Sequence, residues 1–167
     1  MKYFITGCAG FIGNNLTDRL QADGHTVTGY DNFSAGKNEF TTPAPKSPGF
    51  RVVSDDTLDL LAVTQAMCCT DYVIHLAANA DVHLGSGHPK RVLEQNAIAT
   101  YNVLETRRTN GVRRIAFSSM GSLYGKAKVI PTPEDAPFPV QISLYGASKL
   151  ASAGLIQADC ESNDFQG

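Results

Sequence analysis

The 167-residue sequence predicts an α/β fold, a doubly wound parallel sheet flanked by helices. Three observations predict it. A short apolar run near the N-terminus leads directly into three glycines spaced G-x-x-G-x-x-G, namely Gly7, Gly10 and Gly13. Apolar runs of strand length then alternate with amphipathic segments of helix length along the chain. Finally, Asp31 follows the second apolar run, roughly 20 residues beyond the glycines.

The glycines fall between the first predicted strand, residues 2–6, and the first predicted helix, residues 11–23. Because glycine has no Cβ atom, such a turn lets a pyrophosphate approach the backbone. The free N–H groups and the dipole of the helix N-terminus then favour an anion. For the glycines alone, a tight turn without a ligand is the alternative interpretation.

The second predicted strand, residues 25–30, ends beside Asp31. In a dinucleotide-binding fold this position carries the acid that binds the hydroxyls of the adenosine ribose. A carboxylate at this position would also repel the additional phosphate of NADP. The expected cofactor is therefore NAD.

The remaining elements continue the alternation of strands and helices. In chain order they are a strand at 50–53, a helix at 57–67, a strand at 71–76, a helix at 90–110, a strand at 114–118 and a helix at 145–160. Segments 31–49 and 126–142 are rich in prolines and are predicted surface loops. Both loops leave the carboxyl end of a strand, where sheets of this type bind ligands.

Composition limits the functions open to the chain. A hydrophobic share of 43% and a charged share of 18% predict one globular domain, residues 1–167. The net charge of −2 and the lack of a basic run argue against a nucleic-acid partner. No apolar stretch approaches the roughly 20 residues of a membrane span, and the chain begins with a strand rather than a signal peptide.

Cysteine and histidine spacing does not predict a metal site. None of the four cysteines forms a C-x-x-C pair, so we expect free thiols in a reducing compartment, the cytoplasm. His83 and His88 lie in one segment, but their spacing is not one that metal ligands use. His75 is interpreted as a core histidine in preference to a catalytic one.

Tyr145 and Lys149 lie four residues apart at the start of the last predicted helix, so their side chains project from one face. A phenol with a pKa of about 10 is a poor base at neutral pH. A nearby ammonium stabilises the phenolate, lowers this pKa and lets the phenol accept a proton from an alcohol. A surface tyrosine and lysine that share a helix face by chance are the alternative interpretation of the pair alone.

Taken together, these motifs resemble the extended short-chain dehydrogenase/reductase family, specifically its NAD-dependent nucleotide-sugar epimerases and dehydratases. The likeness runs from residue 2 to about residue 150. The matching segments are residues 6–13, 24–25, 31–36, 56–59, 75–78, 89, 96, 102–105, 118–119, 124–125, 133–135 and 145–149.

The resemblance implies a Rossmann domain that binds NAD. The three glycines would line the pyrophosphate, Phe11 and Ile12 would offer backbone N–H groups, and Asp31 and Asn32 would hold the adenosine ribose. Asp56 and Thr57 match the pair at the adenine edge. The full set of implied cofactor-side residues is Gly7, Gly10, Phe11, Ile12, Gly13, Asp31, Asn32, Phe33, Ser34, Gly36, Asp56, Thr57, Leu76, Ala77, Ala78, Asn96, Ser118, Tyr145 and Lys149.

The resemblance also implies a reaction like that of a UDP-hexose 4-epimerase. The Tyr145 phenolate would take a proton from a sugar hydroxyl while hydride passes to the nicotinamide. The keto intermediate would then turn over and be reduced on its other face. Lys149 would tune the phenol and hold the nicotinamide ribose.

The sequence departs from the family pattern at three positions. Met120 stands where the family has a Ser or Thr that hydrogen-bonds the reacting sugar hydroxyl, and a thioether cannot donate that bond. Ser119 or Ser122 is the expected substitute, and catalysis depends on one of them. Ala153 and Ala99 stand where Glu and Gly are usual.

Family members continue into a C-terminal substrate domain, whereas this sequence ends at Gly167. We therefore expect the cofactor-binding part alone, without turnover on its own. A non-catalytic dinucleotide- or partner-binding module is the alternative from another functional class, and a dehydratase or reductase is the alternative among enzymes. The expected partners are a nucleotide-sugar substrate and a second copy that pairs through the helices at 90–110 and 145–160.

Overall fold

The computed structural model describes residues 1–36, 49–80, 87–136, 140–163, 165 and 167. Five parallel strands form one sheet in the order β3-β2-β1-β4-β5. The strands are β1 (Lys2–Thr6), β2 (Thr26–Asp31), β3 (Phe50–Ser54), β4 (Tyr72–His75) and β5 (Ile115–Phe117). The predicted doubly wound parallel sheet is thus confirmed. Its strand order reverses between β1 and β4, and the crevice outside those two strand ends is where such sheets bind ligands.

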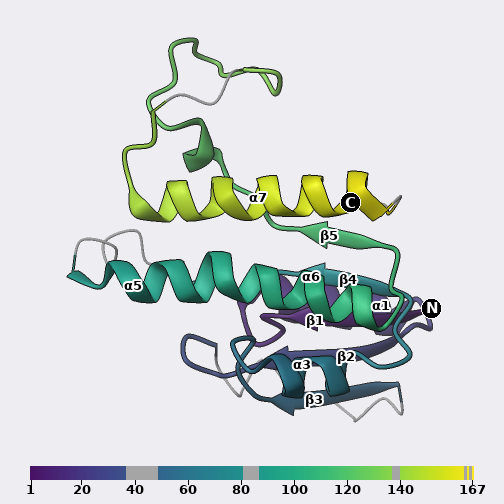
Figure 1. Ribbon diagram of the computed structural model, residues 1–167. Helices are drawn as coiled ribbons and strands as arrows, with labels where there is room; N and C mark the ends of the chain where they lie inside the picture. The colour runs from purple at the N-terminus through teal and green to yellow at the C-terminus, as the bar shows by residue number, and fades with distance from the viewer. Residues whose placement is uncertain (37–48, 81–86, 137–139, 164, 166) are drawn as a thin grey trace.

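Helices cover both faces of the sheet (Figure 1). They are α1 (Phe11–Ala22), α3 (Leu60–Ala66), α5 (Pro89–Val92), the π-helical turn η1 (Leu93–Ile98), α6 (Ala99–Thr109), the 3-10 turn η2 (Gly121–Tyr124) and α7 (Leu144–Asn163). Elements α5, η1 and α6 follow one another without a break and form the long helix that the sequence predicts near 90–110. Helix α7 runs beside this long helix.

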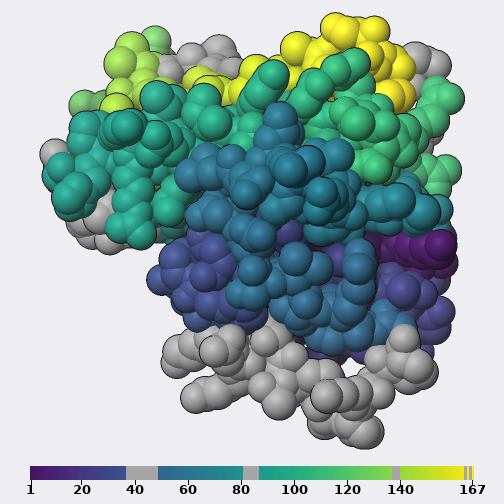
Figure 2. Space-filling model, turned by 60° about the horizontal axis from the view of Figure 1, so that its bottom comes forward, coloured from purple at the N-terminus to yellow at the C-terminus, as the bar shows by residue number. Residues whose placement is uncertain are grey.

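The alternation of side chains along β1 divides the core between the two faces. Phe4 is fully buried in a cluster that includes side chains of α3, α6 and α7. The next residue, Ile5, is fully buried on the other face with Val27, where Leu16 and Leu20 of α1 pack against it. Figure 2 shows that α3, in blue, and the long helix, in teal to green, adjoin on the face turned to the viewer.

Several element bounds differ from the predicted ones for local reasons. Helix α3 begins at Leu60 rather than at 57, because the Asp59 carboxylate caps it by accepting a hydrogen bond from the Ala62 N–H at 2.9 Å. Strand β5 is shorter than predicted, and α7 extends beyond the predicted end at Cys160 to Asn163. Within the predicted loops, residues 37–48 and 137–139 lie outside the described part of the chain, as does His83.

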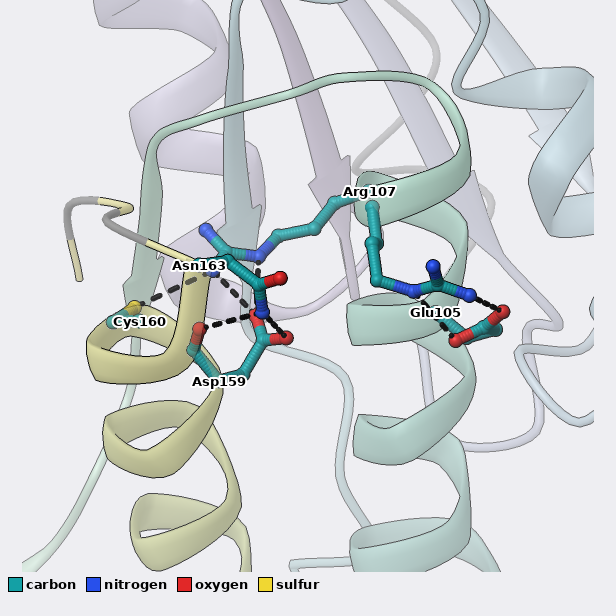
Figure 3. A network of polar contacts seen from close by, with 6 residues as sticks. Glu105, Arg107, Asp159, Cys160 and Asn163 are labelled. Carbon is teal, nitrogen blue, oxygen red and sulfur yellow. Dashed lines mark hydrogen bonds and ion pairs between the residues drawn. The ribbon is translucent and has the colours of Figure 1, made fainter.

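A buried ion pair joins α6 to α7 (Figure 3). The Arg107 side chain is completely buried, and its Nε and Nη2 groups donate to Oδ2 of Asp159 at 3.1 and 2.5 Å. Asn163 donates to the other oxygen of Asp159 at 3.0 Å. Because a buried charge is stable only when it is paired, this contact fixes how the two helices sit against each other.

Candidate functional site

A cavity of about 590 Å³ opens at the carboxyl ends of the strands, where the strand order reverses. It is lined by the glycine turn after β1 and by the residues that follow β2, β3 and β4. Of the residues that the sequence predicts for a cofactor site, those on the cavity wall are Gly7, Gly10, Phe11, Ile12, Gly13, Asp31, Asn32, Ser34, Gly36, Asp56, Thr57, Leu76, Ala77, Ala78 and Ser118.

The turn between β1 and α1 requires glycine at two positions. Gly7 has φ of +72°, and a Cβ atom on it would lie 2.8 Å from the Ala77 backbone nitrogen. A Cβ atom on Gly13 would collide with the Gly7 carbonyl oxygen. Gly10 is the N-cap of α1 and has no side chain. No side-chain hydrogen bond therefore caps the first N–H groups of α1, whose residues line the cavity. This cradle fits a pyrophosphate.

The Asp31 carboxylate connects the end of β2 to the glycine turn. Its Oδ2 atom accepts a hydrogen bond from the Ala9 N–H at 2.9 Å, and its Oδ1 atom accepts one from the Phe33 N–H at 2.9 Å. An ionised carboxylate can accept about four hydrogen bonds, so both oxygens keep capacity for ribose hydroxyls. Phe33, also predicted on the cofactor side, contributes this backbone contact and does not line the cavity itself.

The ends of β2 and β3 are held together by polar contacts beside Thr57. Asn32 donates from Nδ2 to Asp56 Oδ2 at 2.8 Å, and Asp56 Oδ1 accepts from the Leu58 N–H at 2.9 Å. The Tyr30 hydroxyl donates to the Asp56 carbonyl oxygen at 3.1 Å. The structure therefore brings together Asn32, Asp56 and Thr57, the residues predicted to surround the adenosine.

A buried polar network runs beneath the cavity. The ring of His75 is fully buried, with Nδ1 at 2.7 Å from the Thr6 hydroxyl and Nε2 at 3.0 Å from the Thr100 hydroxyl. Burial, together with the charge of Lys149, lowers the pKa of His75 to about 3. His75 is thus a neutral core histidine at neutral pH, as the sequence predicts.

Asn96, predicted as a cofactor-side helix residue, is not among the residues that line the cavity. It is buried in the π-helical turn η1, where its Oδ1 atom accepts from the Asn79 N–H at 2.7 Å. Its Nδ2 group donates to the Ser148 hydroxyl at 2.8 Å, and that hydroxyl donates to the Tyr145 carbonyl oxygen at 2.8 Å. Asn96 therefore links the chain after β4 to the first turns of α7.

Tyr145 and Lys149 are both buried on α7, and neither lines the cavity. Lys149 donates from Nζ to the carbonyl oxygen of Ser118, which does line it, at 3.0 Å, and lies 4.6 Å from the ring centroid of Phe117. Burial lowers the pKa of Lys149 to about 8 and raises the pKa of Tyr145. The predicted lowering of the phenol pKa is therefore not what the structure shows, because the loss of hydration disfavours the phenolate.

The segment around Met120 holds the two serines that could replace its missing hydroxyl. Met120 is half-buried and has extended backbone just before η2. Ser119 and Ser122 also lie off the cavity wall. The Ser122 hydroxyl is buried and has no hydrogen-bond partner among the described residues. The Ser122 carbonyl closely approaches Gly146, so Ser122 lies beside the first turn of α7.

Sequence reasoning missed seven residues of the wall, which are Tyr30, Ala35, Asp55, Asn79, Ala80, Arg91 and Gln95. Most of them are neighbours of predicted residues at the strand ends. Arg91 and Gln95 are separated by four positions on the long helix, so their spacing shows that they share a face. Nothing in the sequence indicates that this face meets the cavity.

Among the described residues, no group of three or more His, Cys, Asp or Glu side chains could hold a metal ion. None of the described helices is long and apolar enough to span a membrane.

Known proteins resemble the chain along most of its length. The UDP-glucose 4-epimerase of Mycolicibacterium smegmatis is 39% identical over 153 residues, which cover 90% of this chain and 49% of that protein. The structure of UDP-glucose 4-epimerase from Thermotoga maritima with UDP-glucose is 31% identical, with a TM-score of 0.89, and the match covers 99% of this chain and 53% of that one. The structure of the Brucella ovis UDP-glucose 4-epimerase in complex with NAD is 25% identical, with a TM-score of 0.89, and covers 98% and 49%.

The chain thus spans about half the length of these relatives. The family model described as "NAD dependent epimerase/dehydratase family" matches residues 3–167. This match covers nearly every residue, and it includes the glycine turn, the strand ends around the cavity and the tyrosine-lysine pair of α7. The chain belongs to the NAD-dependent epimerase/dehydratase family.

Proposed function

We propose that this chain is the NAD-binding domain of a nucleotide-sugar 4-epimerase of the UDP-glucose type. The observation that carries the proposal is the glycine cradle at the point where the strand order reverses, with the Asp31 carboxylate beside it. Backbone N–H groups at the start of α1 suit a pyrophosphate. Asp31 suits the ribose hydroxyls of NAD and disfavours the additional phosphate of NADP.

The proposed chemistry assigns proton handling to α7 and its neighbours. NAD, when bound, supplies the hydride acceptor and donor. The proton of the sugar hydroxyl passes to the Tyr145 phenolate oxygen and later returns to the sugar from that oxygen. Lys149, with a pKa of about 8, is mostly protonated at pH 7 and stabilises the charge that develops on that oxygen. Ser122 is the better placed of the two substitutes for the missing hydroxyl, because its hydroxyl is buried beside the first turn of α7, whereas Ser119 is exposed.

Met120 favours a second candidate function, an NAD-binding module without turnover. The Met120 thioether leaves no donor at the position where the family places a hydroxyl, and burial raises the pKa of Tyr145, which weakens the phenol as a base. In this candidate the cavity binds the dinucleotide, and α7 performs no proton transfer. A dehydratase of the same family remains the alternative among enzymes.

The partners we propose are a nucleotide sugar and a second copy of the chain. The Thermotoga maritima relative was solved with UDP-glucose, which supports a sugar nucleotide as substrate. Exposed apolar side chains on the long helix and α7, including Leu93, Tyr101 and Leu155, support pairing through these helices. Light scattering of the purified chain would report a dimer mass. All four cysteines are free, which fits the reducing cytoplasm.

Calorimetry with NAD tests the proposed function directly. The 167-residue chain should bind NAD, and Gly13→Ala should remove binding, because the added Cβ atom collides with the Gly7 carbonyl oxygen. Gly154→Ala on α7 is the matched control, since a Cβ atom there has no described neighbour within 4 Å. Circular dichroism of both variants checks that the chain remains folded. A wild-type chain that is folded but does not bind NAD would contradict the proposal.

A further inference from the structure

The charges on the cavity wall are separated along its length. The carboxylates of Asp31, Asp55 and Asp56 lie where β2 and β3 end. Arg91, on α5, is the only lysine or arginine among the described residues that line the cavity. It shares its part of the wall with Asn79, in the segment that follows β4. One end of the cavity is therefore anionic and the other carries a single cation.

Hydrogen bonds hold the Arg91 guanidinium from one side. The Gln95 Oε1 atom accepts from Arg91 Nε at 3.3 Å and from Asn79 Nδ2 at 2.7 Å, and both of these partners also line the cavity. A guanidinium has five N–H donors, so the four on its terminal nitrogens remain after the Nε contact. None of the ion pairs between described residues includes Arg91, whereas its neighbour Lys90 pairs with Glu94 at 3.5 Å.

A planar cation with free paired donors suits an oxyanion that can accept two of them, and phosphate is such a group. The acidic end of the cavity suits ribose hydroxyls and repels phosphate, so the adenosine half of a dinucleotide belongs there. The glycine cradle then receives the phosphate that adenosine carries. The second phosphate lies further from the acids, towards the end of β4, where Asn79 and Arg91 are found.

We propose that Arg91 binds the second phosphate of the dinucleotide, the one on the nicotinamide side. This inference rests on the proposed function, that the cavity holds NAD. Gln95 and Asn79 act as positioning residues that orient the guanidinium towards the phosphate.

Titration calorimetry of Arg91→Gln with AMP, ADP and NAD tests this assignment. AMP carries only the first phosphate, so its affinity should stay unchanged. ADP and NAD should each bind about tenfold more weakly, because a charge-assisted pair of hydrogen bonds is lost. The difference from wild type should shrink as salt rises, since an exposed ionic contact is screened. Arg91→Lys should restore part of the affinity, because it keeps the charge without the paired donors.

Lys90→Gln is the matched control, because it removes the same charge from the adjacent residue, which does not line the cavity. It should bind all three ligands as wild type does. The assignment is overturned if Arg91→Gln binds NAD as tightly as wild type. It is also overturned if the substitution weakens AMP binding as much as ADP binding, which would show a general disturbance of the cavity. A wild-type chain that fails to bind NAD instead overturns the proposed function, so the two failures are distinct.

Discussion

The two halves of the site differ in how they are built. On the side proposed for the adenosine, at the ends of β1, β2 and β3, the cavity wall consists largely of backbone and of short polar side chains held by backbone N–H groups. On the side proposed for catalysis, Tyr145, Lys149 and Ser122 lie off the wall, and the properties of these side chains are set by burial. The comparison teaches that the glycine turn of the binding half is fixed by local chain geometry. The catalytic half depends on how distant elements pack.

Tyr145→Phe should distinguish the two halves most clearly, because it should change turnover and leave NAD affinity intact. In a fusion of this chain to the C-terminal half of an epimerase relative, we expect turnover to fall by about 10²–10⁴-fold, because the proton acceptor is lost. NAD affinity should hardly change, since the ring still packs. A coupled assay with UDP-galactose and calorimetry with NAD measure the two effects. Tyr72→Phe, on β4, is the control, and turnover that survives Tyr145→Phe would show that another group is the base.

The next largest effect should come from the ion pair that holds α7. Asp159→Ala leaves the Arg107 guanidinium buried without its carboxylate, which should lower the free energy of unfolding by about 3–5 kcal/mol. Urea unfolding followed by circular dichroism measures this loss of stability. Asp23→Ala removes an exposed pair with Arg19 and should leave the free energy of unfolding nearly unchanged. Equal losses in the two variants would mean that burial does not decide the strength of these pairs.

The contrast between local chain geometry and the packing of distant elements explains what the sequence could predict. The sheet, the glycine turn and Asp31 follow from short-range spacing, because a strand, a turn and a helix cap are each set by neighbouring residues. The contact of Asp31 with Ala9 could not be predicted, since it depends on how two strand ends meet. Asn96 was assigned to the cofactor side by resemblance, but its burial in the π-helical turn η1 does not follow from residue spacing.

Two further features of the site also depend on packing. Arg91 lines the cavity because of where α5 is placed in the fold, and residue spacing does not encode that placement. The direction of the Tyr145 pKa shift was predicted wrongly, because spacing gives the distance to a lysine along a helix but not the loss of hydration in the fold.

The network beneath the cavity should make stability depend on pH. His75 has a pKa of about 3 in the fold and near 6.5 when unfolded, so between these values the unfolded chain binds more protons. Lowering the pH through this window should therefore reduce the free energy of unfolding by about 1.4 kcal/mol per pH unit from this residue. His75→Asn should flatten the slope by that amount in unfolding experiments from pH 6.5 to 4.5. An unchanged slope would mean that His75 is accessible to protons in the folded state.

The smallest effect we expect belongs to the adenosine side alone. Wild type should prefer NAD over NADP by about tenfold or more, because a 2′-phosphate beside the Asp31 carboxylate is repelled. Asp31→Asn should shrink this preference, and it should also weaken NAD itself, since both carboxylate oxygens accept backbone N–H groups and an amide replaces one acceptor with a donor. Calorimetry with both dinucleotides measures the ratio. Equal affinity of wild type for NAD and NADP would show that Asp31 serves the glycine turn and does not face the ribose.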